Sequence, residues 1–104
     1  MTILARMLIL FAGHALCDYP GQGDFLSRGK NPFAALKGVP WYQCMFAHCV
    51  IHAGMVYWIT GSLWMGLAEL VIHFGVDFLK CRGNLTFNQD QFIHYGCKVL
   101  WAVL

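Results

Sequence analysis

The histidines of this chain are spaced for chemistry inside helices. Each has an aspartate or another histidine four positions away, in the pairs His14/Asp18, His48/His52, His73/Asp77 and Asp90/His94. A spacing of four places two side chains one helical turn apart on the same face. Inside an apolar segment such groups usually pair, bind an ion or line a functional cavity. The four pairs therefore predict a metal site built within a helix bundle.

The donor types restrict which metal this site would take. Imidazole nitrogen and carboxylate oxygen suit zinc, iron or manganese, whereas calcium and magnesium sites prefer oxygen ligands alone. We expect a divalent transition metal, with zinc as the first choice and one or two ions bound. The predicted ligands are His14, Asp18, His48, His52, His73, Asp77, Asp90 and His94. Because these exceed the ligands of one tetrahedral zinc, either two ions share them or some aspartates orient histidines from outside the coordination sphere.

Further polar residues near the same helix ends favour a metal-dependent hydrolase. A metal lowers the pKa of bound water to about 7 and polarises the bond to be broken. The candidates for catalytic carboxylates and the general base are Asp18, Asp77, Asp90 and Glu69. The candidates for substrate binding, which would neutralise an anion such as a phosphoester, are Gln22, Lys30, Lys80, Arg82 and Gln91. The expected substrate is a membrane lipid or lipid-linked molecule at the cytoplasmic interface.

The composition indicates that lipid surrounds much of this chain. Its 104 residues, which predict a single domain over residues 1–104, are 59% hydrophobic and only 12% charged. A soluble domain of this length could not bury so much apolar surface. The net charge of +2 comes without a basic run, which excludes nucleic acid as an expected partner. The five cysteines are scattered and predict no disulfide framework.

The predicted elements are four apolar segments, which together indicate an all-α transmembrane four-helix bundle with short first and fourth helices. The segments span residues 2–17, 41–60, 63–79 and from Asn88 or Asp90, as the helix cap, to 104. A polar connection over 21–40 follows the first segment, which we expect to be retained rather than cleaved. Lys98 is expected to extend towards the interface, and Trp101 to lie in an aromatic belt near a segment end.

Charge in the connections predicts the topology. If the four helices alternate in direction, five lysines and arginines lie on one side, at Arg28, Lys30, Lys37, Lys80 and Arg82. The positive-inside tendency places this side in the cytoplasm of a bacterial inner membrane and both termini in the periplasm. At a rise of about 1.5 Å per residue, all four histidine pairs then fall in the same half of the membrane. This common depth is the strongest argument that they form one site.

Two alternatives to a hydrolase remain open. In the first, the protein is a non-enzymatic phage or bacterial membrane component whose polar groups serve folding, oligomerisation or partner binding. Its partner would be a second copy of the chain or another membrane protein. Interhelical hydrogen bonds contribute only about 0.6 kcal/mol each on average, a small return for burying so many ionisable groups. In the second, the cluster is a proton or metal-ion conduit, which its confinement to one half of the membrane makes less favourable.

The polar residues also occur in a characteristic order. They read His14-x-x-x-Asp18, Gln22, Lys30, His48-x-x-x-His52, His73-x-x-x-Asp77-x-x-Lys80 and Asp90-Gln91-x-x-His94. This pattern covers nearly the whole chain and resembles the small membrane proteins of domain-of-unknown-function family 3307, found in bacteria and phage genomes. That family typically reads Asp-Phe-x-x-Gln where this chain has Asp18-Tyr19-Pro20-Gly21-Gln22, so the first helix should end more sharply here. The resemblance implies a polytopic membrane protein with a polar intramembrane cluster and carries no established activity.

Overall fold

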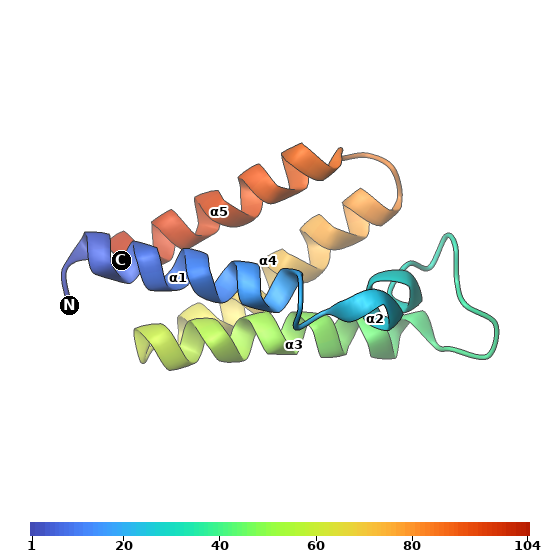
Figure 1. The fold of residues 1–104 in the computed structure, drawn as a ribbon, viewed down its shortest axis with the longest axis horizontal. Helices are drawn as coiled ribbons and strands as arrows, with labels where there is room; N and C mark the ends of the chain where they lie inside the picture. The colour runs from blue at the N-terminus through green and yellow to red at the C-terminus, as the bar shows by residue number, and fades with distance from the viewer.

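The computed structural model describes all 104 residues and contains five α-helices and no strands (Figure 1). The helices are α1 (Ile3–Asp18), α2 (Gly23–Gly29), α3 (Trp41–Thr60), α4 (Leu63–Cys81) and α5 (Phe87–Val103). The all-α prediction is confirmed, and α1 and α5 are shorter than α3 and α4, as expected. The short α2 lies inside the predicted polar connection. Its Asp24 and Arg28 form an ion pair of 3.3 Å that also suits the helix dipole.

The four long helices form a closed bundle. α3 packs against α4, α4 against α5, α5 against α1 and α1 against α3, while α2 packs on α3. The N- and C-termini lie together at one end, where the Arg6 guanidinium donates a hydrogen bond to the Ala102 carbonyl at 3.3 Å (Figure 1). We call this the terminal end. At the opposite end lie α2 and the turn between α4 and α5, and we call it the connection end (Figure 1).

Local sequence sets where the helices begin and end. The Thr2 and Ser62 side chains accept hydrogen bonds from backbone N–H groups in the first turns of α1 and α4. Thr86 caps α5 in a reciprocal arrangement with Gln89, so the prediction of a cap at Asn88 or Asp90 was wrong by two to four residues. The sequence Thr86-x-x-Gln89 is the signal that identifies the true cap.

Two glycines let α3 approach its neighbours closely. A Cβ atom added at Gly66 of α4 would lie 3.0 Å from both the Ala53 carbonyl oxygen and Tyr57 Cβ of α3. One added at Gly13 of α1 would lie 2.9 Å from Met55 Cγ of α3. A larger side chain at Gly66 would press on the backbone of α3, and one at Gly13 would require the Met55 side chain to move, so the glycines help to fix the spacing of the bundle.

The bundle interior is divided into two regions. Towards the terminal end lies the apolar cluster, formed by Leu10, Val56, Met65, Trp101 and Ala102. The rest of the interior holds the polar cluster, whose buried members are His14, Asp18, Lys30, His48, His52, Glu69, His73, Asp77, Asp90, Gln91, His94 and Lys98. Large hydrophobic side chains are instead exposed along every helix, Leu4 and Trp58 among them. Ionisable groups therefore lie inside the protein and much apolar surface lies outside.

The helices differ from the expected membrane spans in one respect. No helix alone has the length and the hydropathy needed to cross a membrane, whereas α1 and α2, joined at a bend of 79°, meet both requirements as a pair. The inward-facing histidines, acids and lysines lower the mean hydropathy of each helix. The transmembrane character of the bundle stays a prediction.

Candidate metal centre

Each long helix contributes one face to the polar cluster. On α4, Glu69, His73 and Asp77 follow one another at intervals of one turn and are fully buried, and the other three helices present similar faces. All four histidine pairs predicted from the sequence are buried in this cluster. The structure thus brings together histidines that lie far apart in the sequence. His14 and His94, for example, are separated by 80 positions.

Four donors lie closest together. One ligand atom each from Asp18, His48, His52 and His73 falls within 4.8 Å of the other three, and all four side chains are buried. Asp18 Oδ1 lies 3.3 Å from His48 Nε2 and 3.3 Å from His52 Nε2. His48 Nε2 lies 3.1 Å from His73 Nε2. We call these four residues the donor set.

Three distances within the donor set match the requirements of a tetrahedral ion. With metal–ligand bonds of about 2.0–2.1 Å, two ligand atoms of a tetrahedral zinc site are separated by about 3.3–3.4 Å. Of the six separations in such a site, the three given above are 3.1, 3.3 and 3.3 Å and agree with this edge length to within a few tenths of an ångström, and the other three are no longer than 4.8 Å. Three imidazole nitrogens and one carboxylate oxygen also form a donor type that zinc, iron and manganese accept. The residues therefore fit a divalent transition metal.

Two nitrogens of the donor set, His48 Nδ1 and His52 Nε2, are buried without a hydrogen-bond partner. His52 Nε2 is buried and makes no hydrogen bond, although Asp18 Oδ1 lies 3.3 Å away. Leaving a buried polar atom unsatisfied costs about 1–3 kcal/mol. A metal ion coordinated by this nitrogen would remove that cost, because the lone pair would then have a partner.

Gln91 determines which oxygen of Asp18 faces the donor set. Its amide nitrogen donates to Asp18 Oδ2 at 2.6 Å and to Asp90 Oδ2 at 3.1 Å, while its amide oxygen accepts from His14 Nε2 at 3.0 Å. Because Oδ2 is engaged by Gln91, the other oxygen, Oδ1, is turned towards His48 and His52. Gln91 thus acts as an orienting partner outside the donor set, which is the usual support for a metal-ligating carboxylate.

Asp18 is also the one buried carboxylate without a lysine or arginine partner within 4.0 Å. It lies just beyond the predicted apolar segment over 2–17. Its oxygens contact His48, His52 and Gln91 instead. A buried carboxylate without a lysine or arginine partner is electrostatically suited to a metal ion placed between it and the histidines.

Lysines neutralise the other carboxylates. Lys30 Nζ donates to Asp77 Oδ2 at 2.6 Å and also contacts the Gln22 amide oxygen. Lys80 Nζ lies 3.2 Å from Asp77 Oδ1 and 3.8 Å from Asp90 Oδ2. Burial alone would lower the pKa of Lys80, which lies beyond the apolar segment over 63–79, but the two aspartates outweigh it and raise this pKa. These pairs explain why Asp77 and Asp90 are not part of the donor set.

The remaining predicted ligands have partners of their own. His94 Nε2 donates to Asp90 Oδ1 at 3.1 Å, and His14 is held by Gln91. The ring of His73 is stacked between those of His52 and His94, with centroid distances of 3.9 and 4.0 Å. The eight predicted ligands therefore separate into four that could bind one ion and four that surround them.

Two residues at the inner boundary of the polar cluster were assigned the wrong role from sequence. Lys98 does not extend to an interface: it is buried and ion-paired with Glu69. Trp101 does not belong to an aromatic belt, because it is buried and its Nε1 donates to Glu69 Oε2 at 2.8 Å. The spacing of Gln91, His94, Lys98 and Trp101, which puts all four on one face of α5, is the signal that could have placed them inside.

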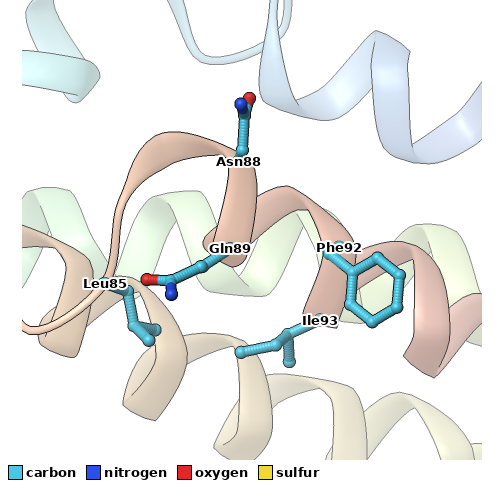
Figure 2. A pocket seen from close by; sticks show the side chains of 5 residues that line it. All are labelled: Leu85, Asn88, Gln89, Phe92 and Ile93. Carbon is cyan, nitrogen blue, oxygen red and sulfur yellow. The ribbon is translucent and has the colours of Figure 1, made fainter.

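The predicted substrate-binding residues occupy different positions. Gln22, Lys30, Lys80 and Gln91 contact members of the cluster. Arg82 is exposed and makes no side-chain hydrogen bond or ion pair. None of the three surface pockets is lined by a buried member of the polar cluster. Figure 2 shows one of them, at the start of α5, formed by Leu85, Asn88, Gln89, Phe92 and Ile93.

Comparison with known proteins adds no relative. No family model, no curated protein and no solved structure matches this chain. Its resemblance to family 3307 therefore stays a prediction, and the site must be interpreted from its own geometry.

Proposed function

We propose that this protein binds one divalent transition metal, most favourably zinc, inside a membrane-embedded helix bundle. The ligands are Asp18, His48, His52 and His73, which come from three different helices. The observation that carries the proposal is the set of separations of 3.1, 3.3 and 3.3 Å between their ligand atoms. Bound metal would then stabilise the bundle by joining α1, α3 and α4.

The distribution of polar and apolar side chains supports the membrane part of the proposal. Twelve buried residues are polar or charged and nine are hydrophobic, whereas large hydrophobic side chains cover the exterior. Exposed apolar surface on this scale is unfavourable in water and favourable in lipid. We place the protein in a bacterial inner membrane, with the connection end, which carries most lysines and arginines, in the cytoplasm and the terminal end in the periplasm.

The narrower proposal is that the metal centre hydrolyses a lipid-linked substrate at the cytoplasmic interface. Metal-bound water is the nucleophile that such a centre supplies. Lys30 and Lys80 lie beside the donor set through Asp77, where their charges would stabilise an anionic group such as a phosphoester. Asp77, whose Oδ2 lies 3.4 Å from His48 Nε2 and whose Oδ1 is paired with Lys80 Nζ at 3.2 Å, is the predicted general base that lies beside the donor set.

A second candidate is a purely structural metal centre in a non-enzymatic membrane protein. It is favoured by the completeness of the donor set, because four protein ligands fill a tetrahedral site whereas catalytic zinc keeps one position open. In this case the metal joins the helices and the surrounding charges serve only to satisfy one another. The two candidates share the same ligands and differ in whether a small molecule can reach the ion.

Metal content tests the shared part of the proposal. We expect the detergent-purified full chain to contain about one transition-metal ion per protein by elemental analysis, and His73→Ala to contain almost none. Val56→Ala, which alters the apolar cluster on α3, is the matched control and should keep the ion. A metal-free but folded wild-type protein, after growth with zinc, iron and manganese supplied, would disprove metal binding.

A cobalt-substituted protein separates the two candidates. Cobalt in a tetrahedral site has a visible absorption spectrum that changes when an added anion binds the ion. An open, catalytic centre predicts a change on adding phosphate or azide, together with phosphoesterase activity that Asp77→Asn abolishes. A closed, structural centre predicts an unchanged spectrum and no activity.

Membrane extraction tests the location. We expect the full chain to stay in the membrane fraction after alkaline carbonate washing and to dissolve only in detergent. Release by carbonate would contradict a membrane-embedded bundle. It would not contradict metal binding, which elemental analysis tests separately.

A further inference from the structure

We propose that Glu69, held by Lys98 and Trp101, is a positioning residue that fixes the proton of His73 on Nδ1 and directs its Nε2 lone pair at the metal. The inference rests on the proposed metal site and adds a function for three buried residues that do not ligate the ion. It also implies that the centre holds a single ion.

The first step is the hydrogen bond between Glu69 and His73. His73 Nδ1 lies 3.3 Å from Glu69 Oε1, and both side chains are completely buried. An ionised carboxylate can only accept hydrogen bonds, so Nδ1 must carry the proton. In a neutral imidazole the other nitrogen, Nε2, then has a free lone pair, and Nε2 is the atom that faces the donor set. Metal-ligating histidines usually have such a partner on their second nitrogen.

The second step is the environment that keeps Glu69 ionised and fixed. Lys98 Nζ contacts Oε1, the same oxygen that accepts from His73, and Trp101 Nε1 donates to Oε2 at 2.8 Å. Both partners come from α5, one turn apart, and both are buried. A buried carboxylate with a cation and two hydrogen bonds has little freedom to rotate. Glu69 therefore holds the His73 ring in one orientation and one tautomer.

The third step concerns a second group of potential ligands. Atoms of Glu69, His73 and His94 also lie within 4.8 Å of one another. Lys98 already supplies a positive charge at Glu69 Oε1, so a second metal ion there would be repelled by an ammonium group at contact distance. Lys98 thus takes the place of a cation and restricts the bundle to one ion.

The test removes the buried pair as a unit. Glu69→Leu combined with Lys98→Met leaves no unpaired charge inside, which preserves the fold better than either change alone. Met65→Leu, one turn before Glu69 on α4, is the control. The tautomer of His73 is measured from ring nitrogen chemical shifts in metal-free, nitrogen-15-labelled protein, and zinc affinity by competition with a chromophoric chelator.

The expected result has two parts. Metal-free wild-type and Met65→Leu proteins show the Nδ1–H form of His73, and the double variant shows the Nε2–H form or a mixture. Zinc affinity of the double variant falls about 10–100-fold. An unchanged tautomer in the double variant, or unchanged affinity, would overturn the inference. Saturation of wild type at two ions would overturn the single-ion part. Absence of zinc binding in wild type would instead refute the proposed function, while the tautomer measurement would still report on Glu69.

Discussion

The apolar and polar clusters occupy the same four-helix interior but are stabilised in different ways. The apolar cluster is held by burial of Leu10, Val56 and their neighbours, a non-directional effect roughly proportional to the area removed from solvent. The polar cluster depends on directed contacts between identified atoms, such as Gln91 to Asp18 at 2.6 Å. A helix bundle can therefore combine two kinds of interior. In one, substitutions change the stability gradually; in the other, the loss of one side chain disturbs several hydrogen-bonded neighbours.

The apolar and polar clusters differ in how well they tolerate substitution. Most side chains of the apolar cluster can be exchanged for others of similar volume with small effects, because their contacts are not directed; the exception is Trp101, which donates a hydrogen bond to Glu69. In the polar cluster, removal of one group leaves buried partners unsatisfied, and each of these costs free energy. In the polar cluster, four donors lie close enough together to hold a metal ion, which is the task we propose for it.

The sharpest test of the comparison is His48→Ala. His48 Nε2 contacts both Asp18 Oδ1 and His73 Nε2, so its removal deletes a ligand at the centre of the donor set. We expect zinc affinity to fall by more than the ~100-fold that loss of an outer partner can cause. Chelator competition measures this, with Val56→Ala two turns along α3 as the control. Wild-type affinity in His48→Ala would contradict the proposed centre.

The opposite change is Leu10→Ala in the apolar cluster. Leu10 is 1% exposed, and deleting its side chain should lower the free energy of unfolding by about 2–5 kcal/mol. The metal content should not change, because Leu10 belongs to the apolar cluster and not to the donor set. Denaturant titration in detergent measures the stability, and Leu8→Ala, at a position 70% exposed, is the control. Loss of metal in Leu10→Ala would show that the two clusters are not independent.

A smaller effect is expected from Gln91→Leu. This change removes the bonds that orient Asp18 and His14 but leaves every proposed ligand in place. Zinc affinity should fall about 10–100-fold, which corresponds to about 1.4–2.7 kcal/mol. Gln43→Leu, at an exposed position on α3, is the matched control. If Gln91→Leu bound zinc as tightly as wild type, Asp18 would not need its orienting partner.

The smallest effect is expected outside both clusters, at the start of α5. Thr86→Ala removes the capping hydroxyl and should destabilise the protein by about 1 kcal/mol, whereas Thr86→Ser should be close to neutral. Faster amide hydrogen exchange in the first turn of α5 would locate the effect, and zinc affinity should stay unchanged. A larger loss of stability in Asn88→Ala than in Thr86→Ala would contradict this and show that Asn88 caps α5, as the sequence predicted.

The helices could be predicted from sequence more completely than the site. The segment 41–60 coincides with α3, and the apolar patterns of α1 and α4 were predicted to within two residues at each end. The helix α2 was not predicted because seven residues with a glycine at each end carry little apolar periodicity. The fact that the histidines lie together could be inferred from depth. Which three of them, with which aspartate, form the donor set could not be predicted.

The amino-acid sequence by itself determined the helical class, the four long helices and the one-turn spacing of the histidine pairs, because these depend on residues close together in the chain. Tertiary structure decided that Asp18 is free for a metal while Asp77 and Asp90 are engaged by lysines, and that Lys98 and Trp101 turn inward to Glu69. Those choices depend on the rotation of each helix about its own axis relative to its neighbours. That rotation is fixed by packing across the whole interior, and local spacing does not encode it.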